Sequence, residues 1–258
     1  MNRILVTFLL AMATAITALA DFTEDQSRFT EACRAYEKGD YLTATSGFQA
    51  LIESGSGTAA VQFNLANTHF KQDKLGLAVQ HYLKCIDLHP ADRDARANLE
   101  YVRSVIQQGT PPRPPILGQL LSTFTLNTWT IAASLATSLW LLLTLACQIN
   151  PTLKETLSMI RPILAFLAVL LLATSVTAQI QRNSDKSAVI TAKTIDARFG
   201  PIEESAMAFT LRDGIEIEVL RVHFGWSLVR EIGQREGWLP TASIQPIGRQ
   251  ARLLTASE

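Results

Sequence analysis

Residues 64–90 read NLANTHFKQDKLGLAVQHYLKCIDLHP, and this stretch predicts a pair of antiparallel helices. The polar run Lys71–Lys74 makes the turn, and Ala78 and Tyr82 lie on the second helix. A small residue and an aromatic one are expected where two helices approach closely and the gap between them must be filled. Pro90 ends the second helix because its ring cannot continue the hydrogen-bond ladder.

The same pattern recurs with a period of 34 residues. Shifting residues 25–57 by this period superposes four pairs, namely Ala32 on Ala66, Tyr36 on Phe70, Ala44 on Ala78 and Phe48 on Tyr82. We therefore expect a helical region over 21–110 with repeats at 25–58 and 59–92 and a capping helix at 93–107. Two repeats and a cap bury less surface than the three repeats usually needed, so the membrane or a partner is expected to complete the stack.

The composition places part of the chain in lipid. Hydrophobic residues make up 48% of the sequence and the mean hydropathy is +0.16, which is too apolar for an ordinary soluble domain. Residues 126–149 carry no charge and are long enough to cross a hydrocarbon core of about 30 Å. Residues 163–180 form a second charge-free run, so we expect two transmembrane helices in a hairpin, joined by a loop over 150–162.

The N-terminus predicts export. Arg3 precedes an apolar run over 4–17, and Ala18-Leu19-Ala20 matches a cleavage site, so 1–20 is expected to be a signal peptide, with an uncleaved anchor as the alternative. The prolines of 111–115, PPRPP, predict a stiff linker between the helical region and the membrane. With two crossings, both soluble modules are expected on the extracytoplasmic side of the inner membrane and the loop in the cytoplasm.

The last part of the chain predicts β-structure. Short alternating runs separated by Gly and Pro follow residue 187, at 188–190, 215–219, 226–229 and 237–239. Strands of this length with turns between them indicate a small β-barrel over 187–248, followed by a loose tail at 249–258.

Three resemblances follow from these residues. Asn64, Leu65, Ala66, Ala78, Tyr82 and Pro90 resemble the tetratricopeptide repeat (TPR) consensus. Ala197, Gly200-Pro201, Gly214, Trp226 to Arg230 and Gly237-Trp238-Leu239 resemble the bacterial SH3 domain. The order of segments resembles the BatE member of the Bacteroides aerotolerance (Bat) family. This resemblance implies an inner-membrane scaffold beside von Willebrand A-domain membrane proteins and a MoxR-type AAA+ ATPase in a stress-tolerance system.

Together these features give the expected fold. We expect a multi-domain membrane protein with an α-helical TPR solenoid, a two-helix transmembrane hairpin and a small all-β SH3-like barrel.

The sequence argues against several functions. Lysine plus arginine equals aspartate plus glutamate at 23 each, so no basic field exists to attract nucleic acid. The four histidines, at 69, 81, 89 and 223, match no metal-ligand spacing, and no phosphate-binding glycine loop occurs. The three cysteines form no CxxC pair. We therefore expect no catalytic residue, no metal and no cofactor.

The binding residues are expected on the concave side of the repeats and on the barrel. The predicted protein-binding residues of the repeats are Phe29, Tyr36, Phe63, Asn67, Phe70, Lys71 and Asn98. Asn67, Lys71 and Asn98 suit the backbone or carboxylate of an extended ligand. The alternative is that Phe63 and Phe70 belong partly to the core and that Asn64 and Asn98 only tie helices together. Trp226 and Trp238 are the predicted aromatic groove of the barrel, with core packing the alternative for Trp226.

The resulting hypothesis is a non-enzymatic membrane scaffold that recruits protein partners, among them other Bat-type membrane proteins. The alternative is a protein that targets peptidoglycan through the C-terminal module. Its test is wall binding by residues 183–258 that persists after the repeats are removed.

Overall fold

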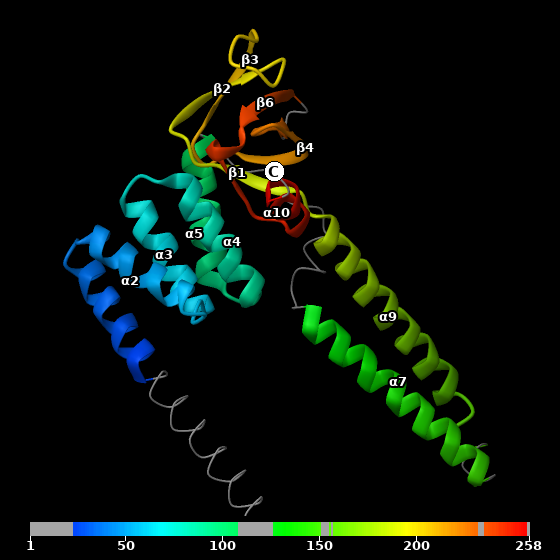
Figure 1. Ribbon diagram of the computed structural model, residues 1–258. Coiled ribbons are helices and arrows are strands. Elements are labelled where there is room, and N and C mark those ends of the chain that lie inside the picture. Colours follow the sequence, from blue (N-terminus) through cyan, green and yellow to red (C-terminus); the bar gives the residue numbers. More distant parts are fainter. Residues whose placement is uncertain (1–22, 108–125, 151–154, 156, 232–234, 257–258) are drawn as a thin grey trace, which may run out of the picture.

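A computed structural model describes residues 23–107, 126–150, 155, 157–231 and 235–256 (Figure 1). The predicted signal peptide at 1–20 and the predicted linker at 111–115 lie outside the described residues. The chain forms three parts: an N-terminal helical module, a long helical hairpin and a C-terminal sheet (Figure 1).

The helical module contains a helix over 23–37, followed by α2 (Tyr41–Glu53), α3 (Ala59–Lys71), α4 (Leu75–Leu88) and α5 (Arg93–Gln107). Polar caps fix where two of these helices begin, because Asp40 and Thr58 accept hydrogen bonds from Thr43 N and Val61 N. Helix 23–37 and α2 share a buried cluster around Phe48, and α3, α4 and α5 share another around Tyr82. Each of the two clusters therefore joins helices that follow one another along the chain.

The hairpin consists of α7 (Leu126–Ile149) and α9 (Ile160–Ser184), which lie side by side (Figure 1). Both are long and apolar enough to cross a membrane. Their few buried residues are small, namely Ala133, Cys147, Ala168 and Ser175, whereas most of the large apolar side chains stay exposed. An apolar surface of this kind is stable in lipid rather than in water, which supports membrane association.

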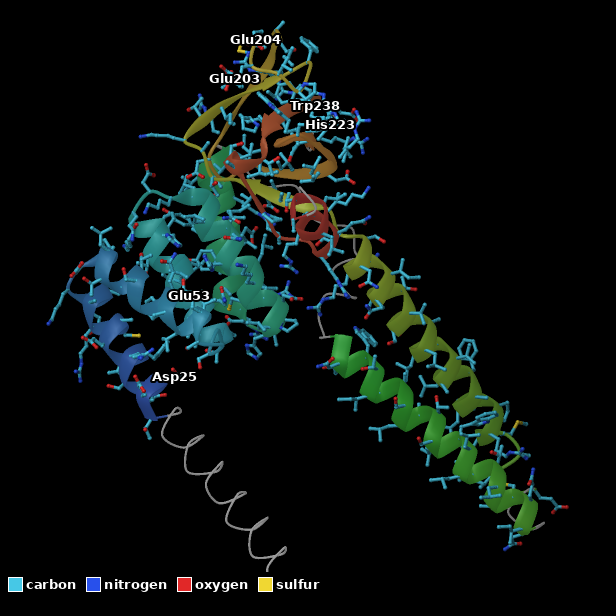
Figure 2. All side chains as sticks on the ribbon, in the orientation of Figure 1. Asp25, Glu53, Glu203, Glu204, His223 and Trp238 are labelled. Atoms are coloured by element: carbon cyan, nitrogen blue, oxygen red, sulfur yellow. The ribbon has the colours of Figure 1, made fainter. Side chains whose placement is uncertain are left out.

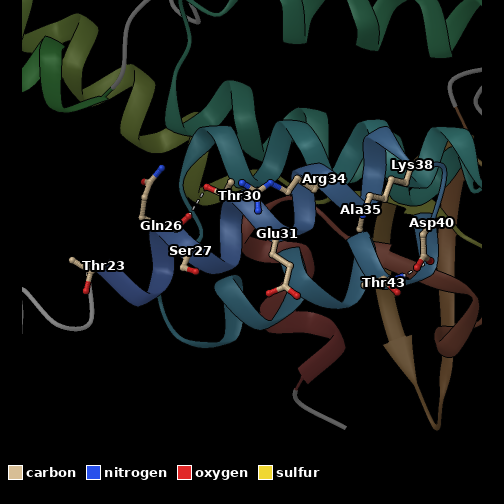
Figure 3. Close-up of a pocket in the computed structure, with 10 residues that line it drawn as sticks. All are labelled: Thr23, Gln26, Ser27, Thr30, Glu31, Arg34, Ala35, Lys38, Asp40 and Thr43. Atoms are coloured by element: carbon tan, nitrogen blue, oxygen red, sulfur yellow. Dashed lines mark hydrogen bonds between the residues drawn. The ribbon is translucent and has the colours of Figure 1, made fainter.

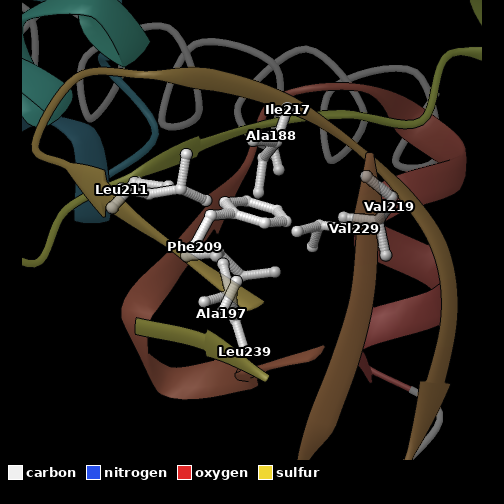
Figure 4. Packing of buried hydrophobic residues seen from close by; sticks show 11 residues of the cluster. Ala188, Ala197, Phe209, Leu211, Ile217, Val219, Val229 and Leu239 are labelled. Atoms are coloured by element: carbon white, nitrogen blue, oxygen red, sulfur yellow. The ribbon is translucent and has the colours of Figure 1, made fainter. Parts of the chain in front are cut away.

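The C-terminal module is an antiparallel sheet in the order β3-β2-β6-β5-β4-β1-β7. Its strands are β1 (Ser187–Ile190), β2 (Thr194–Arg198), β3 (Met207–Arg212), β4 (Glu216–His223), β5 (Trp226–Glu231), β6 (Glu236–Pro240) and β7 (Ile244–Pro246). On its inner face Phe209 of β3 is surrounded by aliphatic residues, including Leu211 of the same strand, Val229 of β5 and Leu239 of β6 (Figure 4). The short helix η1 (Thr241–Ser243) joins β6 to β7.

The predicted fold class is wrong in two respects. The sheet is open rather than a closed SH3-like barrel, since β3 and β7 are its two edges and do not pair with each other. The helices do not form an independent TPR solenoid either. Val189, on strand β1 of the sheet, is part of the buried core that α3, α4 and α5 share. The predicted separation into a solenoid and a barrel is therefore wrong, because β1 belongs to both cores.

Strand β1 explains both corrections. Successive residues of a strand point to opposite faces, so Ala188 and Ile190 enter the core of the sheet while Val189 enters the core of the helical module. A strand that is buried on both faces joins the two modules into one body. The sheet therefore completes the helical stack, a role that the sequence assigned to the membrane or a partner.

Polar contacts lock this docking in place. Asp213, between β3 and β4, accepts hydrogen bonds from Leu75 N at 2.8 Å and Gly76 N at 2.9 Å. Helix α4 has no side-chain cap of its own, so the Asp213 carboxylate caps it from the other module. A Cβ atom on Gly76 would lie 2.1 Å from Ile190 O, so only glycine permits this approach. Arg103 of α5 adds two bonds to Glu216 of β4, at 2.6 and 2.8 Å.

The prediction of a loose tail at 249–258 is also wrong, because most of this segment is a helix. Residues Arg249–Ala256 form helix α10, whose Ala251 is fully buried against the sheet. The amides of Gln250 and Ala251 bond to Asp185 O, and Arg249 bonds to Asn183 at the end of α9. Helix α10 thus ties the sheet to the hairpin.

We predict that Asp213→Ala weakens the docking of the two modules. The change leaves two partly buried helix-terminal N–H groups without an acceptor, which costs about 1–3 kcal/mol. Urea unfolding of the detergent-solubilised chain measures the loss, and hydrogen exchange should speed up at Leu75 and Gly76. The matched control is Asp196→Ala, which removes only an exposed bond from Thr210. Equal losses in both variants would contradict the capping role.

Candidate functional site

The candidate site is a surface of α3 and α5 that we call the amide–aromatic face, formed by Phe63, Asn67, Phe70, Asn98 and Tyr101. Asn67 and Asn98 lie at its centre, and Asn98 Nδ2 donates a hydrogen bond to Asn67 Oδ1 at 3.2 Å. The Tyr82 hydroxyl donates to the same oxygen from below. Both donors thus meet the amide oxygen of Asn67, which points toward Asn98 and Tyr82.

Tyr82 keeps its proton under all ordinary conditions. Burial is the largest cause of its perturbation and raises the pKa of Tyr82 to about 12, so the hydroxyl remains a donor. Its ring is fixed against Phe63, with centroids 6.0 Å apart in an edge-to-face contact. A buried, rigid residue therefore orients the half-buried asparagine pair.

The asparagine pair retains one donor and one acceptor. Within the part of the chain that the structure describes, Asn67 Nδ2 and Asn98 Oδ1 have no hydrogen-bond partner. A peptide unit presents a carbonyl acceptor and an N–H donor, so the pair is complementary to the backbone of an extended segment. Beside it the ring of Phe70 contacts that of Tyr101 at 5.8 Å, and Tyr101 is 60% exposed. The face thus offers backbone recognition beside an apolar surface.

The other residues predicted for the concave side divide between surface and core. Lys71 is exposed at the end of α3. Phe29 packs edge-on against the buried Phe48 at 5.9 Å, and Tyr36 contacts the ring of Tyr41 at 5.6 Å. Phe29 and Tyr36 are half-buried parts of the first core cluster rather than extensions of the amide–aromatic face.

A polar hollow of about 720 Å³ lies on the helix over 23–37 (Figure 3). Its lining includes Glu31, Arg34, Lys38 and Asp40, and Asp40 already accepts the amide of Thr43 as a helix cap. The charges are mixed and exposed, so the hollow shows no preference for one ligand charge.

The two predicted tryptophans of the sheet have different environments. Trp226 pairs with Pro240 and Trp238 pairs with Leu228, so both lie on the outer face. Trp238, labelled in Figure 2, is only 7% exposed. The Arg221 guanidinium lies over its ring at 5.3 Å. Trp226 and Pro240 line a hollow of about 290 Å³, to which Trp238 does not contribute. Of the two tryptophans predicted to form one groove, only Trp226 lines this hollow.

Two histidines that lie on different helices are stacked in the helical core. His69 and His81 have ring centroids 5.3 Å apart, and His81 Nδ1 contacts Gln62 Oε1 at 2.7 Å. Both nitrogens of His69 are buried and lack a hydrogen-bond partner among the described residues. Burial, helped by Lys74 for His69 and by Lys84 for His81, lowers the pKa of His69 to about 4 and that of His81 to about 3. Both rings are therefore neutral near pH 7.

No group of three or more potential metal ligands occurs among the described residues. The cysteines are free, and burial raises the pKa of the Cys85 thiol to about 11, so it is not a thiolate near neutral pH.

Sequence reasoning missed three residues that organise the sites. Tyr82 was recognised as a repeat aromatic residue but not as the group that orients Asn67. Tyr101 carries no repeat signal. Asp213 precedes Gly214 in an ordinary turn, and nothing local indicates that it contacts α4.

No family model matches this chain, and no curated protein matches it.

The stacked histidines predict a loss of stability in acid. Above about pH 6.5 both rings are neutral in the folded and unfolded states, and their contribution is constant. As the pH falls from 6.5 toward 3 the unfolded chain binds more protons, so the free energy of unfolding falls by up to about 1.4 kcal/mol per pH unit for each histidine. Below the folded pKa values the loss from this pair is complete.

Urea unfolding at pH 7, 5 and 4 measures this effect. His69→Leu should show a shallower decline than the unsubstituted chain, while the exposed control His223→Asn should show the same decline. An unchanged slope in His69→Leu would exclude the buried pair as a cause.

Proposed function

We propose that this protein is a membrane-anchored, non-enzymatic scaffold that holds an extended segment of a partner protein on its amide–aromatic face. The single observation that carries the proposal is the asparagine pair, oriented by Tyr82, with one free donor and one free acceptor. Side-chain amides of this kind bind the backbone of a peptide irrespective of its sequence, and the flanking Phe70 and Tyr101 rings select for apolar side chains.

The anchor is the α7–α9 hairpin, and the docked modules support a common location for both. Asp213 and Leu75 are in contact although the hairpin lies between them in the sequence. Two groups in hydrogen-bond contact share one compartment, so the chain between them crosses a bilayer an even number of times. With the predicted signal peptide, this favours the periplasmic or extracytoplasmic side of the inner membrane for both modules.

The resemblance to the Bat family provides candidate partners. It favours other Bat-type membrane proteins with von Willebrand A domains, within a stress or aerotolerance complex that includes a MoxR-type ATPase. The runner-up is peptidoglycan targeting through the sheet, and its support is the hollow beside Trp226. That hollow is bordered by Arg198 and Glu203, which suit the charged groups of wall peptides. Binding of purified murein that is lost on Trp226→Ala and kept on Asn67→Ala would favour the runner-up.

We predict that Asn67→Ala and Asn98→Ala each lower partner capture about tenfold, because each loses hydrogen bonds to the peptide backbone. A photo-crosslinking residue at position 101 in the native membrane measures capture, with attached chains identified by mass spectrometry. A crosslinker at the exposed Leu42, on α2, reports background.

The matched control is Asn64→Ala, on the same helix, whose side chain only bonds to Ala60 O. Tyr82→Phe keeps the ring and removes the donor, so it should also lower capture while leaving the helical circular dichroism unchanged. Capture that is insensitive to Asn67 and Asn98, or equally sensitive to Asn64, would refute the assignment of this face.

The common location of the modules predicts a labelling pattern in intact cells. Glu53→Cys and Phe224→Cys, at exposed positions of the two modules, should react with a membrane-impermeant maleimide. Ser158→Cys, in the loop of the hairpin, should react only after lysis. Labelling of Ser158→Cys in intact cells, or of only one module, would contradict the proposed arrangement.

A further inference from the structure

A third hollow, of about 600 Å³, lies where the chain leaves α9 and enters the sheet. It is lined by Asp185 and Lys186 at the junction, by Glu216 and Glu218 of β4, and by Arg230 of β5. None of these residues belongs to the amide–aromatic face, and neither the anchor nor the partner site uses the hollow.

Most of the charges in the hollow are already paired. Glu216 holds Arg103, and Arg230 bonds to Glu218 at 3.2 Å and Glu236 at 2.8 Å. Within the described part of the chain, four groups keep free capacity: the ammonium of Lys186 and one carboxylate oxygen each of Asp185, Glu218 and Glu231. Their positions are held by the backbone, because Asp185 accepts the amide of Ser187 and Lys186 O accepts the amide of Val219. The lining of the hollow therefore includes one free cation and three free carboxylate oxygens.

The height of the hollow above the membrane follows from α9. Its apolar run ends at Ile180, and Ser184 lies four residues further, about 6 Å along a helix. The headgroup layer on each side of a bilayer is roughly 5–8 Å thick. If α9 spans the bilayer as the proposed function requires, the hollow opens at the level of the lipid headgroups.

We propose that this hollow binds the headgroup of a membrane phospholipid that carries both a phosphate and a primary ammonium group. Lys186 contacts the phosphate, and the N–H groups of the ammonium donate to Asp185 and Glu218. A primary ammonium has three N–H donors and forms charge-assisted hydrogen bonds with carboxylates, whereas a quaternary ammonium has none. An anionic headgroup without an ammonium would leave both carboxylates facing a like charge. The hollow thus selects phosphoethanolamine over phosphocholine and phosphoglycerol.

Helix α10 and the helical module position the hollow against the membrane. Arg249 bonds to Asn183, Asp185 O accepts two amides of α10, and Arg182 pairs with Asp87 of α4 at 2.8 Å. The junction is therefore held from two sides, and a bound lipid fixes the angle at which the soluble body stands on the bilayer.

The test uses the full chain in nanodiscs that contain equal amounts of phosphatidylethanolamine, phosphatidylcholine and phosphatidylglycerol. Native mass spectrometry after release should show one retained phosphatidylethanolamine, preferred over phosphatidylcholine about tenfold. Lys186→Gln and Asp185→Asn should each reduce this retention about tenfold. The control Lys193→Gln, which changes an exposed lysine of the sheet away from the hollow, should retain it fully.

Equal retention of the three lipids, preference for phosphatidylglycerol, or retention unaffected by both variants would overturn the proposal. Soluble glycerophosphoethanolamine at millimolar concentration should not compete; if it does so fully, the ligand is a free headgroup compound and the lipid assignment is wrong. Flotation with liposomes distinguishes a failure of membrane insertion from a loss of lipid preference. A chain that does not insert overturns the anchored scaffold as well, whereas a chain that inserts without lipid preference overturns only this inference.

Discussion

The carboxylate of Asp213 at the N-terminus of α4 is the contact on which the architecture depends. It joins residues 138 positions apart, across both helices of the hairpin. Around it, Gly76 permits the backbones to meet, and Val189 extends from the sheet into the helical core. A helix end without its own cap and a strand buried on both faces each need the other module. The helices and the sheet are therefore one folding unit, although they are two segments of sequence.

Local patterns predicted the elements well. The aligned Ala66, Ala78 and Tyr82 are fully or almost fully buried, as the 34-residue period requires, and α7 has the predicted bounds of the first charge-free run. The runs at 188–190 and 226–229 lie in strands β1 and β5. These successes share a cause: periodicity and chain length report the environment of each residue through its immediate neighbours.

The errors arose where distant segments meet. Residues 188–190 read as an ordinary apolar strand, and the pattern does not reveal that one of its faces is covered by helices and the other by the sheet. The closed barrel and the independent solenoid were therefore both wrong. Residues 249–256 read as a polar tail because the amphipathic contact that orders them depends on Asp185 and on a single buried alanine. The asparagines of the candidate site were identified, but their orientation depends on Tyr82, whose hydroxyl partner is not encoded by spacing.

The docking of the sheet on the helices also restricts how the helical module is held relative to the hairpin. The sheet covers one end of the helical stack, so the amide–aromatic face cannot be extended by further helices on that side. Arg182 and Asp87 connect the top of α9 to α4, and α10 connects the same point to the sheet. In the proposed function, a partner segment held between α3 and α5 would be coupled to the hairpin through packed helices and charge pairs rather than through a flexible chain. The fold itself would then set the distance of that partner from the bilayer.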